Sequence, residues 1–260
     1  MKLAIGGRTL DSGWELLTVG QLVTRFPRTS KVFEYRGIDY FCGGRKTLEE
    51  ACLLRGVDAL HLRREIAAVL ISREDAPDSE WESRSLTSLI ENIVNTHHAL
   101  IRSERPRLTE LARKVARVHS PRHYELNSLA DAVDRLFHLL VPHLDEEEKG
   151  FFTLAKRWEA SGMNVSLVAS LAFELERLEH DHHEVRRLLE SIRRLTSGFV
   201  PPSDGCDAYL TLFDGLESLE EDIHLHVHKE NNILHARILS ALGKGTKAKR
   251  KRPRDAFLGH

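Results

Sequence analysis

Apolar residues recur at alternating spacings of three and four across residues 86–240, and this helical period constrains the fold more than any other feature of the 260-residue chain. Breaks in the pattern fall near 119–123, 160–164 and 198–205, which leaves four long segments joined by short loops. Four amphipathic helices with short connections are typical of an antiparallel, up-down-up-down four-helix bundle. The sequence therefore predicts such a bundle over this stretch.

Residues 1–75 show a different pattern, of short helical stretches with marked ends. Thr18 with Gln21 forms one capping box and Thr47 with Glu50 forms a second, so each pair predicts a helix that begins just after the threonine. We therefore expect a small helical N-terminal domain ahead of the bundle and an all-α fold for the chain.

Two further stretches flank the predicted bundle. Residues 76–85 are polar and contain Pro77, and we interpret them as a linker. Residues 241–260 carry the run KGTKAKRKRPRD, whose charge predicts a disordered basic tail. The whole chain is nearly neutral, with 38 Lys+Arg against 39 Asp+Glu, so the composition does not favour a nucleic-acid-binding protein.

Two features of the composition bear on where the protein works. The sequence has no apolar run long enough to cross a bilayer, and its N-terminus lacks the apolar core of a signal peptide. Three cysteines are too few for a disulfide-stabilised fold, and we expect them to be reduced thiols. These observations predict a cytoplasmic protein with no membrane anchor.

Each apolar stripe of the bundle is interrupted by a histidine, or by a histidine and a glutamate four residues later, where the next core residue is expected. The interruptions are His143 and Glu147 in the second segment, His182 in the third, and His226 and Glu230 in the fourth. In the first segment both His97 and His98 fit a stripe, and spacing alone does not choose between them. A buried ionisable group is costly unless it is paired or binds a metal.

The inventory of these interruptions is four histidines and two glutamates from four helices. A His-x-x-x-Glu pair places an imidazole and a carboxylate on one helix face, and such mixed ligands suit transition metals. One histidine on an apolar stripe is more often a hydrogen-bonded core residue, but interruptions in all four stripes favour two metals bridged by carboxylates. For the other histidines we expect surface positions or positions behind the ligands: His97, His119, His123, His138, His180, His183, His224, His228 and His235.

The same residues carry recognisable motifs. They are IVNTHHALI around His98, HLDEEEKGFF from His143, LEHDHHEVRRLLE around His182 and HVHKENNIL from His226. The bundle resembles a hemerythrin-like (HHE) cation-binding domain. The segment TVGQLVTRFPRTSKVFEYRGIDYFCGGRKTLEEACLLRGVD resembles the short domain that precedes such bundles in the iron-sulfur cluster repair family of the ScdA/YtfE type. Together the two resemblances cover nearly the whole chain except the basic tail.

The resemblance implies a non-haem di-iron centre, in which two Fe ions are bridged by carboxylate or oxo groups. It selects His98 over His97, makes Glu147 and Glu230 the bridging carboxylates, and makes the four histidines terminal ligands. It implies repair of iron-sulfur clusters damaged by oxidative or nitrosative stress, with iron donation or handling at the centre. The implied partners are damaged iron-sulfur proteins, NO, O2 or peroxide, and a second copy of the chain in a homodimer. The alternative is a carrier or sensor of O2 or NO without repair activity.

Two positions depart from the family pattern. The family's usual F-C-C-G-G turn here places Phe41 before Cys42, so that turn cannot form a vicinal dithiol. Cys42 alone could act as a nucleophile or accept NO, or it could simply be a small residue in a tight turn. Arg186 stands where the family typically has glycine, and it could gate a pocket, bind an anion or reach solvent.

Overall fold

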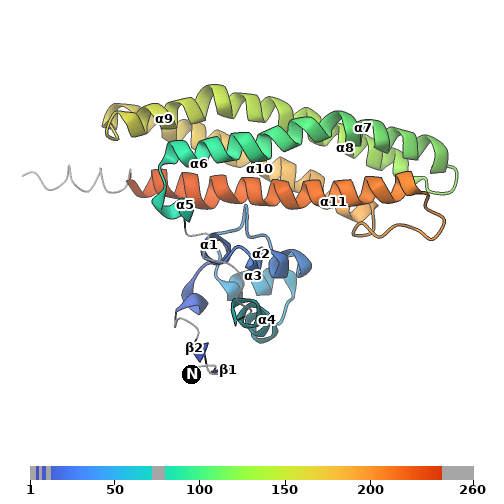
Figure 1. Cartoon of the computed structure of the whole chain (residues 1–260), viewed down its shortest axis with the longest axis horizontal. Coiled ribbons are helices and arrows are strands. Elements are labelled where there is room, and N and C mark those ends of the chain that lie inside the picture. The colour runs from blue at the N-terminus through green and yellow to red at the C-terminus, as the bar shows by residue number, and fades with distance from the viewer. Residues whose placement is uncertain (1–3, 6–7, 10–12, 72–79, 242–260) are drawn as a thin grey trace, which may run out of the picture.

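The computed structural model describes residues 4–5, 8–9, 13–71 and 80–241, and helices dominate this part of the chain (Figure 1). The two strands are β1 (Ala4–Ile5) and β2 (Arg8–Thr9), which pair in an antiparallel hairpin. The predicted all-α class is confirmed. Most of the predicted linker and nearly all of the predicted basic tail lie outside the described residues.

Two of the N-terminal helices begin at the caps that the sequence predicts. They are α1 (Val19–Arg25), α2 (Thr29–Tyr35), α3 (Leu48–Arg55) and α4 (Ala59–Ile71), preceded by a 3-10 turn at Trp14–Leu16. Both predicted capping boxes form: Thr18 caps α1 and Thr47 caps α3. Gly56 ends α3 at a φ of 65°, a left-handed conformation that favours glycine.

Four long helical segments form the bundle. They are α6 (Leu86–Ile93) with α7 (Ala99–His119), α8 (Glu125–Glu146) with α9 (Phe152–Ala160), α10 (Val168–Leu195), and α11 (Asp207–His228), with a short α5 (Glu80–Ser83) ahead of them. Helix α7 packs on α8 and α11, and α8 packs on α10, while α6 packs on α9. The connections lie at the ends of the bundle (Figure 1). None of the described helices is both long and apolar enough to cross a membrane.

Three of the four segments contain a π-helical turn, which inserts one extra residue into the helix. The turns span Val94–His98, Glu147–Phe151 and Lys229–His235. The extra residue shifts the apolar stripe that follows it. Continued past Glu147, the apolar stripe of the second segment predicts that Leu154 resumes the core. Leu154 is instead only half-buried, and Ala155 takes the core position.

The apolar core is divided into two clusters along the bundle. One joins the N-terminal helices to residues of α7, α8, α10 and α11, and includes Ile101, Leu140 and Val185. The other lies at the α6 and α9 end and includes Ile93 and Leu178. The interrupting histidines and glutamates fall between these clusters in sequence on every segment, so they form a polar layer enclosed by apolar layers.

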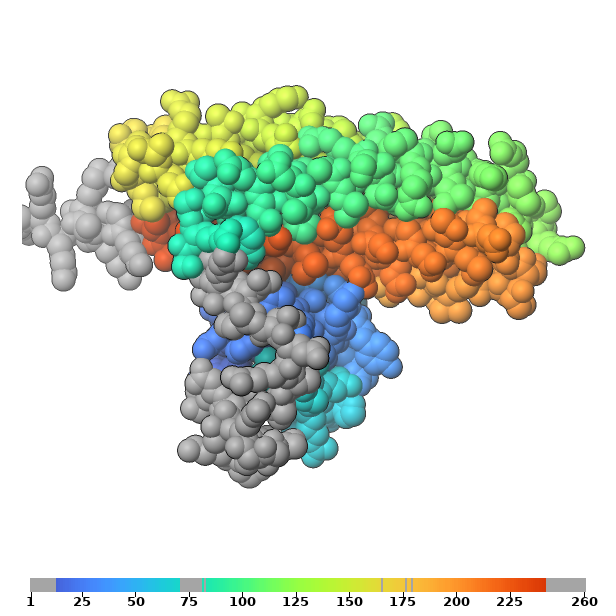
Figure 2. Space-filling model, viewed as in Figure 1, coloured from blue at the N-terminus to red at the C-terminus, as the bar shows by residue number. Residues whose placement is uncertain are grey.

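The N-terminal helices form a small lobe seated against the α11 side of the bundle (Figure 2). Helix α1 contacts the π-helical turn Lys229–His235. At this junction the Thr24 hydroxyl lies 3.2 Å from Nε2 of His228. The lobe therefore rests on the same stretch of chain that carries Glu230.

Candidate metal centre

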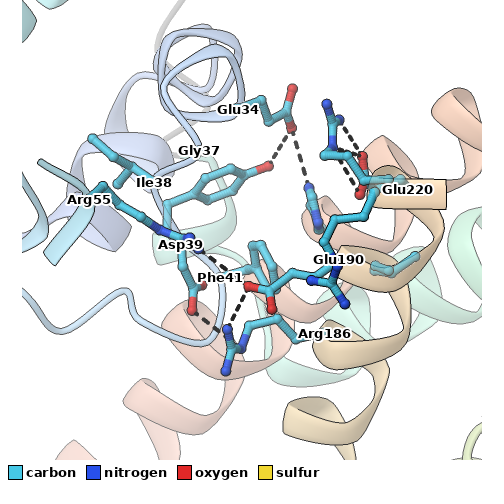
Figure 3. A pocket seen from close by; sticks show the side chains of 14 residues that line it. Glu34, Gly37, Ile38, Asp39, Phe41, Arg55, Arg186, Glu190 and Glu220 are labelled. Atoms are coloured by element: carbon cyan, nitrogen blue, oxygen red, sulfur yellow. Dashed lines mark hydrogen bonds and ion pairs between the residues drawn. The ribbon is translucent and has the colours of Figure 1, made fainter. Parts of the chain in front are cut away.

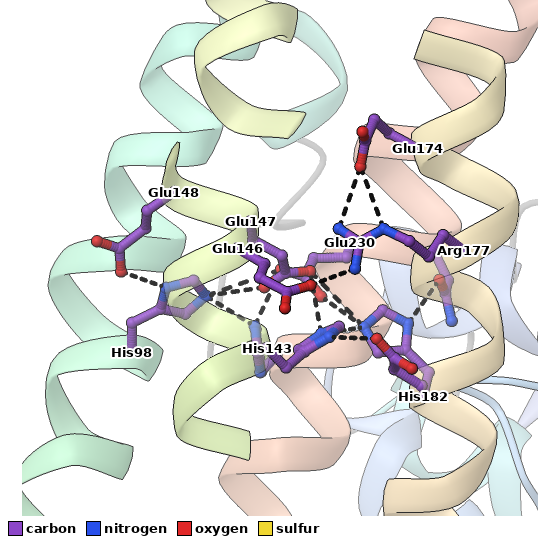
Figure 4. A network of polar contacts seen from close by, with 12 residues as sticks. His98, His143, Glu146, Glu147, Glu148, Glu174, Arg177, His182 and Glu230 are labelled. Carbon is purple, nitrogen blue, oxygen red and sulfur yellow. Dashed lines mark hydrogen bonds and ion pairs between the residues drawn. The ribbon is translucent and has the colours of Figure 1, made fainter. Parts of the chain in front are cut away.

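The six predicted site residues come together in the polar layer (Figure 4). They are His98, His143, Glu147, His182, His226 and Glu230. Each is at most 3% exposed, so all six side chains are removed from solvent. Their ligand atoms form two groups, within each of which every atom lies within 4.8 Å of the others.

The two groups share their carboxylates. His98 and His226 belong to one group, with Nε2 atoms 3.1 Å apart. His143 and His182 belong to the other, with Nε2 atoms 3.2 Å apart. Glu147 and Glu230 belong to both groups. We call the first group the His98/His226 half and the second the His143/His182 half.

Each shared carboxylate directs one oxygen at each half. Oε2 of Glu147 lies 3.5 Å from Nε2 of His98, and its Oε1 lies 3.2 Å from Nε2 of His143. Oε1 of Glu230 lies 3.0 Å from Nε2 of His226, and its Oε2 lies 3.2 Å from Nε2 of His182. This arrangement is what two carboxylates need in order to bridge a pair of cations.

Hydrogen bonds behind three of the imidazoles orient the rings. The pairs are His98 with Glu148 (2.8 Å), His143 with Asp181 (3.2 Å) and His182 with Asn231 (3.1 Å), each through Nδ1. An Nδ1–H that donates to an oxygen leaves the lone pair of Nε2 free to point inward, as in metal-binding histidines. The fourth ring differs, because Nδ1 of His226 is buried without a hydrogen-bond partner.

The carboxylate oxygens fit a bound cation. Both oxygens of Glu147 and Oε2 of Glu230 are buried and receive no hydrogen bond. Buried carboxylates left in that state are costly, and a cation between them and the inward Nε2 atoms would satisfy them. The donor set of imidazole nitrogens and carboxylate oxygens suits iron and other divalent transition metals. The cluster therefore has the donor set and the geometry of a metal-binding site.

Charge within the cluster shifts its pKa values strongly. Burial works to lower the pKa of His143, but the carboxylates of Glu147 and Asp181 outweigh it and raise the pKa to about 10. The same competition, with Glu230 as the main carboxylate, raises the pKa of His98. Burial works to raise the pKa of Glu230, yet the surrounding imidazoles hold it well below its usual range. A proton or a metal cation thus stabilises the buried carboxylates.

The structure separates His97 from His98, which the stripe left open. Both lie in the π-helical turn Val94–His98 and both are buried, because the wider turn directs two successive residues inward. His98 enters the cluster, as the resemblance implies. His97 instead pairs through Nδ1 with Asp222 at 2.8 Å and accepts from Nζ of Lys229 at 3.0 Å.

Cys42 lies beside the cluster and is not one of its members. It is half-buried, and its Sγ donates to the backbone oxygen of His182 at 3.7 Å. It also lines a cavity of about 430 Å³ between the N-terminal lobe and α10. The thiol therefore reaches the main chain of one candidate ligand.

The two departures from the family pattern line one cavity of about 370 Å³ (Figure 3). Phe41 stacks on His224 with ring centroids 4.1 Å apart. Arg186 donates to Glu190 at 2.8 Å and lies 3.8 Å from a carboxylate oxygen of Asp39. These contacts place an aromatic ring and a guanidinium at the junction of lobe and bundle.

Sequence reasoning missed several polar residues around the cluster. Glu148, Asp181 and Asn231 each support a ring, and the only sequence signal for them is that each directly adjoins a proposed ligand. His228 and His235 lie off the stripes but are at most 4% exposed. His235 lies in the π-helical turn Lys229–His235, whereas His228 is covered by the N-terminal lobe, where the Thr24 hydroxyl lies 3.2 Å from its Nε2.

We expect His228 to make the fold sensitive to acid. Burial lowers its pKa to about 4, whereas an unfolded histidine titrates near 6.5. The unfolded state therefore binds more protons between these values, and stability falls as the pH drops from about 6.5 to about 4, by up to about 3 kcal/mol. The measurement is urea unfolding of the metal-free protein and of His228→Gln across pH 4–7.

The variant should lose less stability than the parent protein over that range. His138→Gln is the matched control, because His138 is exposed and its substitution should leave the pH dependence unchanged. Identical pH dependence of the parent protein and His228→Gln would contradict the expectation.

Comparison with known proteins gives two family matches. The hemerythrin HHE cation binding domain matches residues 89–238, and the ScdA_N domain, described as a domain of unknown function (DUF542), matches residues 16–70. The first match alone spans more than half of the chain.

Relatives match over both regions. The chain is 31% identical to the iron-sulfur cluster repair protein YtfE of Enterobacter sp. (strain 638) over 222 residues, covering 85% of this chain and 96% of the relative. It is 29% identical to the protein of the same name from Escherichia coli O157:H7, with the same coverage. It is 28% identical to a probable iron-sulfur cluster repair protein of Haemophilus influenzae, again with the same coverage. The chain therefore belongs to the iron-sulfur cluster repair family with a hemerythrin HHE cation binding domain.

Proposed function

We propose that this protein repairs iron-sulfur clusters damaged by oxidative or nitrosative stress, by holding iron at a non-haem di-iron centre and donating it to the damaged protein. The observation that carries the proposal is the pair of buried carboxylates, Glu147 and Glu230, each directing one oxygen at each pair of histidines. The names of the relatives support repair over the alternative of an O2 or NO carrier or sensor.

The proposed ligands divide evenly. His98 and His226 would hold one iron, His143 and His182 would hold the other, and Glu147 and Glu230 would each supply a carboxylate to both. Bound iron would supply a redox-active Lewis acid able to take NO, O2 or peroxide as a small ligand. The protein's own contribution is a dry site whose ligands are oriented by hydrogen bonds, with no thiolate among them to retain the metal tightly.

Cys42 is a proposed thiol site next to the centre. Its Sγ contacts the backbone of His182, so a nucleophilic or NO-accepting thiol there would act close to the His143/His182 half. Without a neighbouring cysteine in the turn, this role involves a single thiol.

The remaining proposals concern the cellular location, the partners and the domain boundaries of the protein. We place the protein in the cytoplasm, as a homodimer that meets damaged iron-sulfur proteins and binds neither membrane nor nucleic acid. We also propose that residues 1–75 and 86–240 are separate domains joined by a linker at 76–85, with the basic tail 241–260 outside both. The tail is the part of the chain that would contact an acidic partner if one exists.

Reactivation of a damaged client tests the function. An iron-sulfur hydratase inactivated by NO or peroxide is incubated anaerobically with the iron-loaded protein, and its activity is followed against iron transferred. We expect activity to return with the iron-loaded protein and not with a Glu147→Ala/Glu230→Ala variant. A stable, reversible O2 adduct without reactivation would instead support the carrier. Cys42→Ser in the same assay measures the contribution of the thiol.

A further inference from the structure

The hydrogen bonding of Nδ1 of His182 differs in kind from that of the other three proposed ligand histidines. His98 and His143 donate to carboxylates, and Nδ1 of His226 has no hydrogen-bond partner. His182 donates to the amide oxygen of Asn231 at 3.1 Å. An amide has a second functional end, so Asn231 can connect this ring to another part of the molecule.

The other end of Asn231 faces the N-terminal lobe. Its Nδ2 donates to the backbone oxygen of Phe41 at 3.5 Å, and the adjacent Asn232 donates to the same oxygen at 2.9 Å. Asn232 also donates to the backbone oxygen of Tyr40 at 3.2 Å. We call the segment Tyr40–Gly44 the docking turn. Two neighbouring asparagines of the bundle thus hold its carbonyl groups.

The docking turn also reaches the backbone of the same ligand. Sγ of Cys42 donates to the carbonyl oxygen of His182 at 3.7 Å. The N-terminal lobe therefore contacts His182 along two routes, one through the amide of Asn231 to the ring and one directly to the main chain. Within the described residues, the hydrogen bonds behind His98 and His143 come from the bundle itself.

Glycines make this close contact possible. A Cβ on Gly44 would lie 2.0 Å from Oδ1 of Asn232 and 2.6 Å from the carbonyl oxygen of Tyr40. A Cβ on Gly20 would lie 2.5 Å from the same Oδ1. These separations are far below van der Waals contact, so any larger residue at either position must displace the Asn232 amide or the docking turn and so disturb this contact.

We propose that Asn231 is a positioning residue through which the docked N-terminal lobe sets the metal affinity of the His143/His182 half. The inference rests on the proposed di-iron site. The lobe holds the Nδ2 of Asn231, which fixes the amide so that its oxygen accepts from Nδ1 of His182 and the Nε2 lone pair faces the metal. The His98/His226 half lacks this connection, so the two metal positions differ in their dependence on the lobe.

The test measures one half at a time. His98→Ala leaves the His143/His182 half with both imidazoles and both carboxylates, and His182→Ala does the same for the other half. Anaerobic binding of Fe²⁺ alone is measured by calorimetry. Added to His98→Ala, Asn231→Ala should weaken binding about 10- to 100-fold. Added to His182→Ala, it should change binding by no more than roughly two-fold, as expected of independent sites.

Two further variants keep the proposal falsifiable. Asn231→Asp retains an acceptor for Nδ1 of His182 but loses the Nδ2 donor to the carbonyl of Phe41, so it should restore only part of the affinity in the His98→Ala protein. Full restoration would overturn the link to the lobe. Gly44→Ala disturbs the contact between the docking turn and Asn232 and should weaken the same half without changing the His182→Ala protein. Circular dichroism establishes that each variant is folded.

Each unfavourable outcome has a distinct meaning. Equal weakening of both halves by Asn231→Ala would show a general structural role and overturn the proposal. A folded Gly44→Ala protein with unchanged affinity would overturn the link to the lobe. If the parent protein bound no more iron than Glu147→Ala/Glu230→Ala, the proposed function would fail instead. If the parent protein bound two irons but Asn231→Ala changed the affinity of both halves alike, only the proposed role of Asn231 would fail, and the proposed function would stand.

Discussion

Replacing both Glu147 and Glu230 by alanine should abolish iron binding, from about two ions per chain to nearly none. Each carboxylate serves both halves, so the double variant leaves each metal position with two imidazoles only. Loss of a single ligand typically weakens a site strongly, and loss of both bridges removes the negative charge that balances two divalent cations. Metal analysis after anaerobic reconstitution, with Mössbauer spectra of the reconstituted protein, measures the result.

Glu146→Gln is the matched control for this experiment. Glu146 precedes Glu147 in the same acidic run, but its side chain is 54% exposed and pairs with Arg177 on the surface. Its substitution should leave the iron content unchanged. Retention of iron by the double alanine variant, or an equal loss in Glu146→Gln, would show that the two shared carboxylates do not hold the metal.

The spacing of the apolar residues is enough to predict most of the fold. In the second segment Leu136 and Leu140 are buried as the stripe predicts, and His143 and Glu147 follow them at the same inward positions. The physical reason is that a bundle helix presents one face to the core, so a polar residue on that face must meet other polar residues there. The sequence could therefore predict that the interrupting residues converge.

The π-helical turns mark the limit of this argument. A stripe assumes a constant period, and an inserted residue changes the phase at one point. For this reason the spacing could not choose between His97 and His98 as the ligand. For the same reason the prediction that Leu154 resumes the core was wrong. The burial of His228 and the role of Asn231 were missed for a further reason. Both depend on the N-terminal lobe, and no helical period records a contact between lobe and bundle.

Metal affinity should rise steeply with pH. In the metal-free protein the carboxylates raise the pKa of His143 to about 10, and they also raise that of His98. Near neutral pH the His143 ring then carries a proton that an incoming cation must displace. The apparent association constant of the His143/His182 half should increase about tenfold per pH unit below pH 10, or about 100-fold from pH 6 to pH 8.

The stability of the metal-free fold changes with pH in the opposite direction. A raised pKa means that the folded state binds the proton of His143 more tightly than the unfolded chain, whose histidines titrate near 6.5. The metal-free fold therefore has this stabilisation in full below about pH 6.5 and loses it as the pH rises toward 10. Raising the pH thus destabilises the metal-free protein while it strengthens metal binding.

Calorimetry in two buffers of different ionisation enthalpy measures the protons released for each Fe²⁺ bound under anaerobic conditions. We expect close to one proton at pH 7.5 for the ion bound at the His143/His182 half, because the pKa of His143 is raised to about 10. Glu147→Gln removes the carboxylate nearest His143 and should reduce that number for the ion that still binds, whereas His138→Gln should not alter it. Binding without proton release, at an affinity independent of pH, would show that the imidazoles are already neutral in the metal-free protein. Some other charge would then have to balance the buried carboxylates.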